Sequence, residues 1–170
     1  EDLARGEGAF VSDMAGLCDV AGLSNVEFAN MLRTNGITLK TEVNLAYMSI
    51  SGSAPSASLR LLFNSVLALV RERKPDRQAF EYYKACETLR IAADRRRQDG
   101  LYAVMDSLMA PGYKYSPTKQ MRALRENLPQ RVDEYFSRRF EKFNDGVIVL
   151  IGDFEENMLR KELSSMLAAF

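Results

Sequence analysis

The chain has 170 residues, 46% hydrophobic and 27% charged, and its 23 basic and 23 acidic residues leave no formal net charge. This predicts a single globular domain over residues 1–170, and it argues against a dedicated nucleic-acid or anionic-membrane binder, which would carry a basic excess. Because the sequence contains no histidine, a histidine-based nucleophile system and a histidine-ligated zinc ion are excluded within the chain itself.

Two amphipathic helices are predicted first. Phe10, Met14 and Leu17 recur at helical spacing and predict a helix over residues 8–18, ending before Gly22. A second helix begins at a capping box, in which a hydroxyl and a carboxylate three residues later each satisfy a free backbone N–H. The residues that define this second helix are Ser24 and Glu27 at its start, Val26, Met31 and Leu32 within it, and Asn35-Gly36 at its end.

The hydrophobic period then changes from that of a helix to that of a strand. Apolar or β-branched residues alternate with polar ones over residues 37–43, and residues 46–52 follow as an antiparallel partner across a turn at Asn44. Ser53 and Pro55 open a strong helix. Its predicted core face consists of Leu59, Leu62, Phe63, Val66, Leu69 and Val70.

Helices dominate the second half of the predicted fold. Pro75 ends the preceding helix and Asp76 caps the next, which runs to about Gln98 with its apolar face at Phe80, Tyr83 and Leu89. The later predicted elements are a short helix near 100–109, a helix from Ser116-Pro117, a helix after Pro129 bearing Val132, Tyr135, Phe136 and Phe140, a buried strand at 147–151, and a helix with Leu159, Leu163 and Leu167 that Asp153 caps.

This order of elements predicts an α+β fold in which an antiparallel sheet is covered by helices on one face. Three strands are few for so many helices, so we expect further strands of the sheet to precede the first residue. The chain does not begin with Met and no signal-peptide pattern opens it, so the sequence assigns no compartment. Its longest apolar stretch, at 146–152, is too short for a membrane span.

The same order resembles the pitrilysin, insulysin and mitochondrial-processing-peptidase family of zinc metallopeptidases, most closely over residues 6–72 and 117–168. Further stretches similar to that family are Ser24–Phe28, Ile50–Val66, Ser116–Phe140 and Val147–Leu159. In that family the first helix carries an inverted zinc motif close to G-x-A-H-x-x-E-H-M. Its two histidines ligate zinc, its glutamate activates the bound water, and a glutamate on a later helix is the third ligand.

The motif is degenerate in this sequence. Its frame is kept by Gly6, Phe10 and Met14. Ala9 stands at the first ligand position, Ser12 at the position of the base and Asp13 at the second ligand position, and Glu87 is a possible relic of the third ligand. The resemblance therefore implies no catalytic residue, no metal site and no cofactor in this chain.

The family is built from paired homologous domains that enclose a chamber for an extended peptide, and one domain of the pair lacks zinc. The resemblance thus implies a non-catalytic, metallopeptidase-like domain whose partner is a homologous zinc-bearing domain, in the same chain or on another subunit, and whose parent protein hydrolyses peptides. Two alternatives remain open. One is a peptide-binding or assembly scaffold of the same fold with no active partner, and the other is an unrelated α+β domain.

Other patterns favour structural roles. The basic run Arg95–Arg97 is flanked by acidic residues and is typical of a solvated helix end, and Gly152-Asp153-Phe154 lacks the glycines and lysine of a phosphate loop. The remaining candidates are also expected to be structural. They are two carboxylate pairs (Glu155-Glu156, Asp13 with Asp19), the methionines Met105, Met109, Met158 and Met166, and two cysteines expected to be buried (Cys18, Cys86). The hairpin edge is the more interesting one, since a free strand edge accepts an extended peptide.

Overall fold

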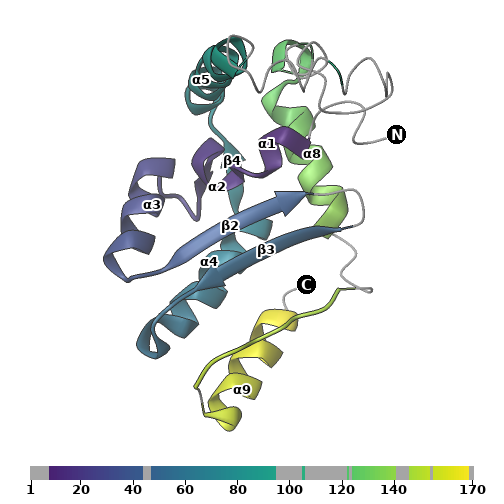
Figure 1. Cartoon of the computed structure of the whole chain (residues 1–170). Helices are drawn as coiled ribbons and strands as arrows, with labels where there is room; N and C mark the ends of the chain where they lie inside the picture. Colours follow the sequence, from purple (N-terminus) through teal and green to yellow (C-terminus); the bar gives the residue numbers. More distant parts are fainter. Residues whose placement is uncertain are drawn as a thin grey trace.

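The computed structural model describes residues 8–43, 47–94, 105, 122, 124–140, 146–153 and 155–168. The elements in these ranges are α1 (Gly8–Val11), α2 (Met14–Leu17), β1 (Cys18–Val20), α3 (Asn25–Thr34), β2 (Thr38–Val43), β3 (Met48–Ser53), a 3-10 turn (Ser56–Ser58), α4 (Leu59–Arg71), β4 (Arg73–Pro75), α5 (Arg77–Asp94), α8 (Pro129–Phe140) and α9 (Glu156–Leu167). The predicted α+β class is confirmed (Figure 1).

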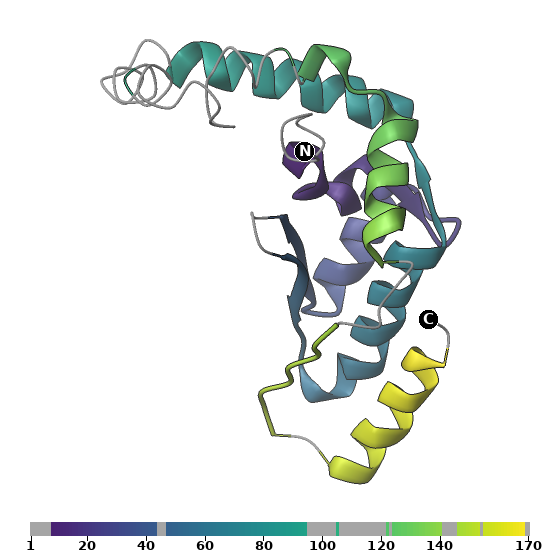
Figure 2. The same cartoon turned by 90° about the vertical axis from the view of Figure 1, so that its right-hand side faces the viewer.

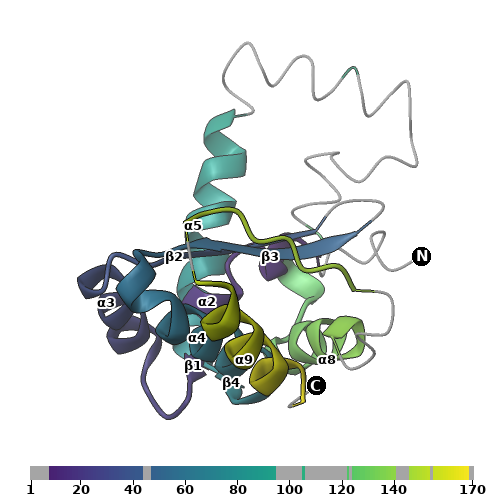
Figure 3. The same cartoon turned by 90° about the horizontal axis from the view of Figure 1, so that it is seen from below.

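Two small antiparallel sheets replace the single sheet that was predicted. The expected hairpin is present, with β2 and β3 paired from Thr38 opposite Ser53 to Val43 opposite Met48. A second pair, β1 with β4, joins Cys18 to Pro75 and Val20 to Arg73. The sequence did not indicate this pair, because strands of three residues are too short to display a period. Figure 3 shows α3 and α4 on the same side of the hairpin.

The predicted starts of α3 and α5 are confirmed, and each has a local cause. Ser24 accepts from the backbone of Glu27, whose carboxylate in turn accepts from the backbone of Ser24, so the capping box is complete. The helix ends at Gly36, whose φ of +66° suits glycine. Asp76 accepts a 2.8 Å hydrogen bond from the backbone of Gln78 at the start of α5, the long helix at the top of Figure 2.

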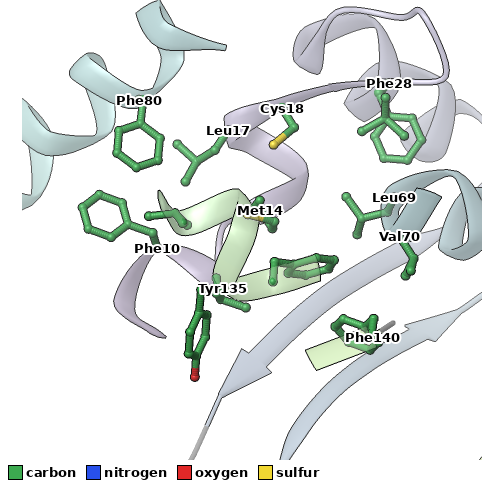
Figure 4. Close-up of a cluster of buried hydrophobic side chains, with 14 of the residues drawn as sticks. Phe10, Met14, Leu17, Cys18, Phe28, Leu69, Val70, Phe80, Tyr135 and Phe140 are labelled. Atoms are coloured by element: carbon green, nitrogen blue, oxygen red, sulfur yellow. The ribbon is translucent and has the colours of Figure 1, made fainter. Parts of the chain in front are cut away.

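The main core lies where α1, α2, α4, α5 and α8 converge (Figure 4). The rings of Phe10 and Phe80 stack at 4.6 Å between centroids and tie α1 to α5. The predicted face of α8 is buried as expected; its members are Val132, Tyr135, Phe136 and Phe140. Three apolar residues of the predicted helices are exposed instead: Val26 is 64%, Leu89 71% and Leu167 45% exposed. Each lies on the outer side of its helix.

Arg73 links β4 to α8 from inside the protein. Its side chain is only 4% exposed and forms an ion pair with Asp133 at 2.6 Å. The guanidinium also donates to the carbonyls of Leu69 and Val70, and it lies 4.4 Å from the centroid of the Phe136 ring. A buried cation of this kind is tolerated because its donors are satisfied and its charge is paired.

The predicted buried strand at 147–151 is wrong. The segment is extended but belongs to neither sheet, and Val147, Val149 and Ile151 are 83%, 73% and 94% exposed. Within the described residues no β-strand pairs with it, so its backbone lacks the ladder that defines a strand. Only Leu150 packs, against a small cluster with Phe63 and the α9 residues. Asp153 does not cap α9 either, since the N-cap residue is Glu155.

Several predicted features lie outside the described residues. They are the turn at Asn44, the predicted end at Gln98 of the helix that Asp76 caps, most of the helix near 100–109, the start of the helix at Ser116-Pro117, and the basic run Arg95–Arg97.

Candidate functional site

The predicted single helix over residues 8–18 is wrong: it divides into α1 and α2 at a turn formed by Ser12 and Asp13. The backbone N–H of Asp13 donates to the carbonyl of Phe10 at 3.1 Å, and the carbonyl of Asp13 accepts from Gly16 at 2.8 Å. Phe10 and Met14 are anchored in the core on either side of this turn. The chain between them therefore turns outward and presents two polar side chains to solvent.

The degenerate motif positions are thus distributed over a helix and a turn. Ala9 is in α1, whereas Ser12 and Asp13 are exposed in the turn that follows it. The apolar spacing correctly identified which side chains enter the core. It did not reveal the break, because the four-residue spacing of Phe10 and Met14 is compatible both with one helix and with two short ones.

Glu87 of α5 lies close enough to Asp13 for the two charges to interact. Partial loss of solvent raises the pKa of Asp13, and the negative charge of Glu87 raises it further. Glu87 itself has a side chain 23% exposed, and its carboxylate accepts from Arg90 one turn later, at 2.7 Å in the closest contact. The structure therefore brings together two of the sequence candidates, Asp13 and Glu87, from the first turn and from α5.

Tyr83 completes this cluster and was not recognised as a site residue from the sequence. Its ring packs against Phe10 with centroids 5.4 Å apart. Burial, followed by the charges of Glu87 and Asp13, raises the pKa of its phenol to about 12, so the hydroxyl stays protonated at neutral pH. The spacing of Phe80, Tyr83 and Glu87 was the available signal, because these residues share one face of a helix.

A cavity of about 360 Å³ opens beside the same turn. Its lining residues are Ser12, Asp13, Ala15, Gly16, Leu39, Lys40, Thr41, Glu42 and Leu69. Four of these are consecutive in β2, whose side chains alternate between two faces: Thr41 is buried, whereas Lys40 and Glu42 are exposed. Neighbouring residues of a strand point to opposite faces of the sheet, so they can line the same cavity only if it runs along the edge of the strand. The cavity therefore lies between an edge of β2 and the α1–α2 turn.

Within the described part of the chain, that edge of β2 has no strand paired with it. There β2 forms a ladder with β3 alone, and on its other side the hydroxyl of Thr41 donates to the carbonyl of Val11. In Figure 1, α1 and α2 lie beyond β2 on the side opposite β3. Unpaired N–H and C=O groups on such an edge are available to an added strand.

The residues at the motif positions do not fit a zinc ion. Catalytic zinc takes three protein ligands from histidine, carboxylate or thiolate groups. Ala9 carries no ligand atom, Ser12 offers a neutral hydroxyl, and the carboxylate of Glu87 is engaged by Arg90. Only Asp13 offers a free carboxylate, and the described residues contain no group of three or more histidine, cysteine or acidic side chains suited to a metal.

Those of the other sequence candidates that the structure describes do not assemble into a site. Cys18 is buried as expected, and that burial raises the pKa of its thiol to about 12, which makes it unreactive at neutral pH. The expectation for Cys86 was wrong, because it is exposed. Of the methionines, Met105 is exposed and Met166 is buried in the small C-terminal cluster.

No described helix combines the length and apolarity that a membrane crossing requires. No family model matches this sequence, and no curated protein matches it.

Proposed function

We propose that this chain is a non-catalytic domain of a zinc metalloendopeptidase, and that it pairs with a homologous zinc-bearing domain to enclose a chamber for an extended peptide. The observation that carries the proposal is the cavity along the free edge of β2, bounded by the turn that holds Ser12 and Asp13. It rests also on the sequence resemblance, in which the same turn corresponds to the zinc motif of the active domain.

The edge of β2 supplies the way in which a peptide would be held. An extended peptide adds to a free strand edge through main-chain hydrogen bonds, which depend little on its sequence. Neither Ser12 nor Asp13 supplies a metal-activated water, so the bound segment is held and not cleaved here. Hydrolysis then belongs to the partner domain, where zinc would polarise the scissile carbonyl and activate water.

Zinc stoichiometry of the full-length protein tests this proposal. We expect about one zinc ion per full-length chain or heterodimer after gel filtration, together with chelator-sensitive hydrolysis of a quenched fluorescent peptide. Replacing Asp13 by Ala, alone or together with Glu87→Ala, should leave the zinc content unchanged, because neither residue belongs to the zinc site.

Loss of zinc in the Asp13→Ala protein would overturn the proposal, since it would place the metal in this domain. A well-folded full-length protein that takes up no zinc even when the metal is added would also overturn it. That result would favour the same fold acting as a peptide-binding or assembly scaffold without an active partner.

A further inference from the structure

The cavity beside β2 carries an unbalanced negative charge. Of the described residues that line it, Asp13 and Glu42 are acidic and Lys40 is the single basic one. Lys40 and Glu42 are two residues apart in β2 and lie on the same exposed face of the strand. These two offset each other, which leaves Asp13 as the uncompensated charge at the opposite wall.

Among the residues that the structure describes, the Asp13 side chain has no bonding partner. In the described residues its carboxylate forms neither a hydrogen bond nor an ion pair, and it does not cap α2 although it occupies the N-cap position. Its surroundings make this arrangement unfavourable, because partial desolvation and the nearby Glu87 both disfavour the charged form and raise its pKa. Arg90 does not relieve it, since that guanidinium is bound to Glu87.

We propose that this cavity selects a basic residue: a lysine or arginine side chain of the extended peptide held along β2 pairs with the carboxylate of Asp13. The inference rests on the proposed function, because it names the class of peptide that the chamber holds. A cation at this place gains the attraction of the Asp13 carboxylate, whereas a neutral side chain of the same length does not. The apolar stem of lysine or arginine would lie against Leu39 and Leu69, which line the same cavity.

The test uses the full-length protein and two synthetic peptides that differ only in whether one lysine is acetylated. The first is a fluorescent peptide rich in threonine and valine with one central lysine, and the second carries acetyl-lysine at that place. We expect the lysine peptide to bind about five- to tenfold more tightly by fluorescence anisotropy, as for the net gain of one hydrogen bond at a partly exposed site. The preference should decrease as salt is added.

Asp13→Asn should abolish the preference while leaving the affinity for the acetyl-lysine peptide unchanged. Asp19→Asn is the matched control, since it removes the same charge outside the cavity and should keep the preference. Asp13→Asn should not unfold the protein. The raised pKa means that the ionised carboxylate costs stability at neutral pH, so the substitution should leave the melting temperature equal or higher there. The difference should shrink as the pH falls through the raised pKa of folded Asp13 and vanish below the ordinary pKa of an aspartate in the unfolded chain.

The possible failures are distinguishable. Equal binding of both peptides by the unmodified protein, or a preference that survives in Asp13→Asn, would overturn the inference and leave the proposed peptide chamber standing. If neither peptide bound, the result would contradict both the proposed peptide chamber and the inference that rests on it.

Discussion

The core packed between α1 and α8 and the segment at residues 146–151 are both strongly apolar, yet they differ completely in burial. Phe10, Val132 and Phe136 have no exposed surface, whereas Val147, Val149 and Ile151 are more than two-thirds exposed. The difference lies in the surroundings and not in the hydrophobicity. The apolar face of α8 meets α1 and β4, whereas the segment at 146–151 meets one small cluster, and only through Leu150.

The same difference separates the two clusters energetically. The main core joins residues from the first helices, α4, α5 and α8, so that removal of one side chain affects several elements. The C-terminal cluster has three buried members, Phe63, Leu159 and Met166. Substitutions in the two regions should therefore differ in both the size and the reach of their effects.

Phe136→Ala should give the largest effect. The ring is completely buried, packs at a tilt against Phe140 with 4.7 Å between centroids, and lies beneath the guanidinium of Arg73. Truncating a buried phenylalanine costs about 4 kcal/mol of unfolding free energy, because a cavity remains. Urea unfolding followed by circular dichroism measures the loss. Val149→Ala is the matched control in the exposed segment, and an equal loss in both variants would remove the proposed difference between the regions.

Arg73→Met should cost about 3 kcal/mol, since it leaves the carboxylate of Asp133 near the core without its partner. The methionine preserves much of the packing against Phe136, so the loss reports mainly on the ion pair and on the carbonyls of Leu69 and Val70. The measurement is again the free energy of unfolding in urea. Arg160→Met breaks an exposed pair with Glu156 and should change stability little. A similar small effect at Arg73 would show that its network adds no net stability.

Leu159→Ala should cost about 2 kcal/mol, the lower end for a buried leucine, because its cluster is small and near the surface. A sharper test is which helices lose protection from hydrogen exchange. We expect the amides of α9 to exchange hydrogen by local opening, and the substitution to speed this exchange while α8 stays protected. Faster exchange in both helices would mean that the two clusters unfold as one unit.

The sequence predicted those elements whose signals are local. The capping box of Ser24 and Glu27, the hairpin alternation, and the apolar face of α8 each lie within one element, and each was confirmed. The break at Ser12-Asp13 was missed, because the core residues on both sides keep helical spacing. The pairing of β1 with β4 was missed for another reason: it joins residues more than fifty positions apart, and no local pattern reports such a partner.

The candidate site was only partly predictable for the same reason. Asp13 and Glu87 were selected by the resemblance alone, and their proximity became visible only when α5 was placed against α1 and α2. Tyr83 and the cavity beside β2 depend on that packing as well. The segment at 147–151 shows the opposite error. An apolar run predicts burial only if a surface exists to cover it, and the run itself cannot reveal whether one does.

The smallest effect is expected from changing Val149 and Ile151 together to Thr. The two side chains are 73% and 94% exposed, so replacing a methyl group of Val149 and the ethyl group of Ile151 by hydroxyls removes no buried contact. The free energy of unfolding should change by less than about 0.5 kcal/mol. Solubility should increase, because an exposed apolar strand-like segment promotes association between chains. Urea unfolding and light scattering, made on the same samples, measure the two quantities. A loss of stability above about 1 kcal/mol would show that the outer face of this segment is covered in solution. Both regions would then be packed, and they would differ only in what each packs against.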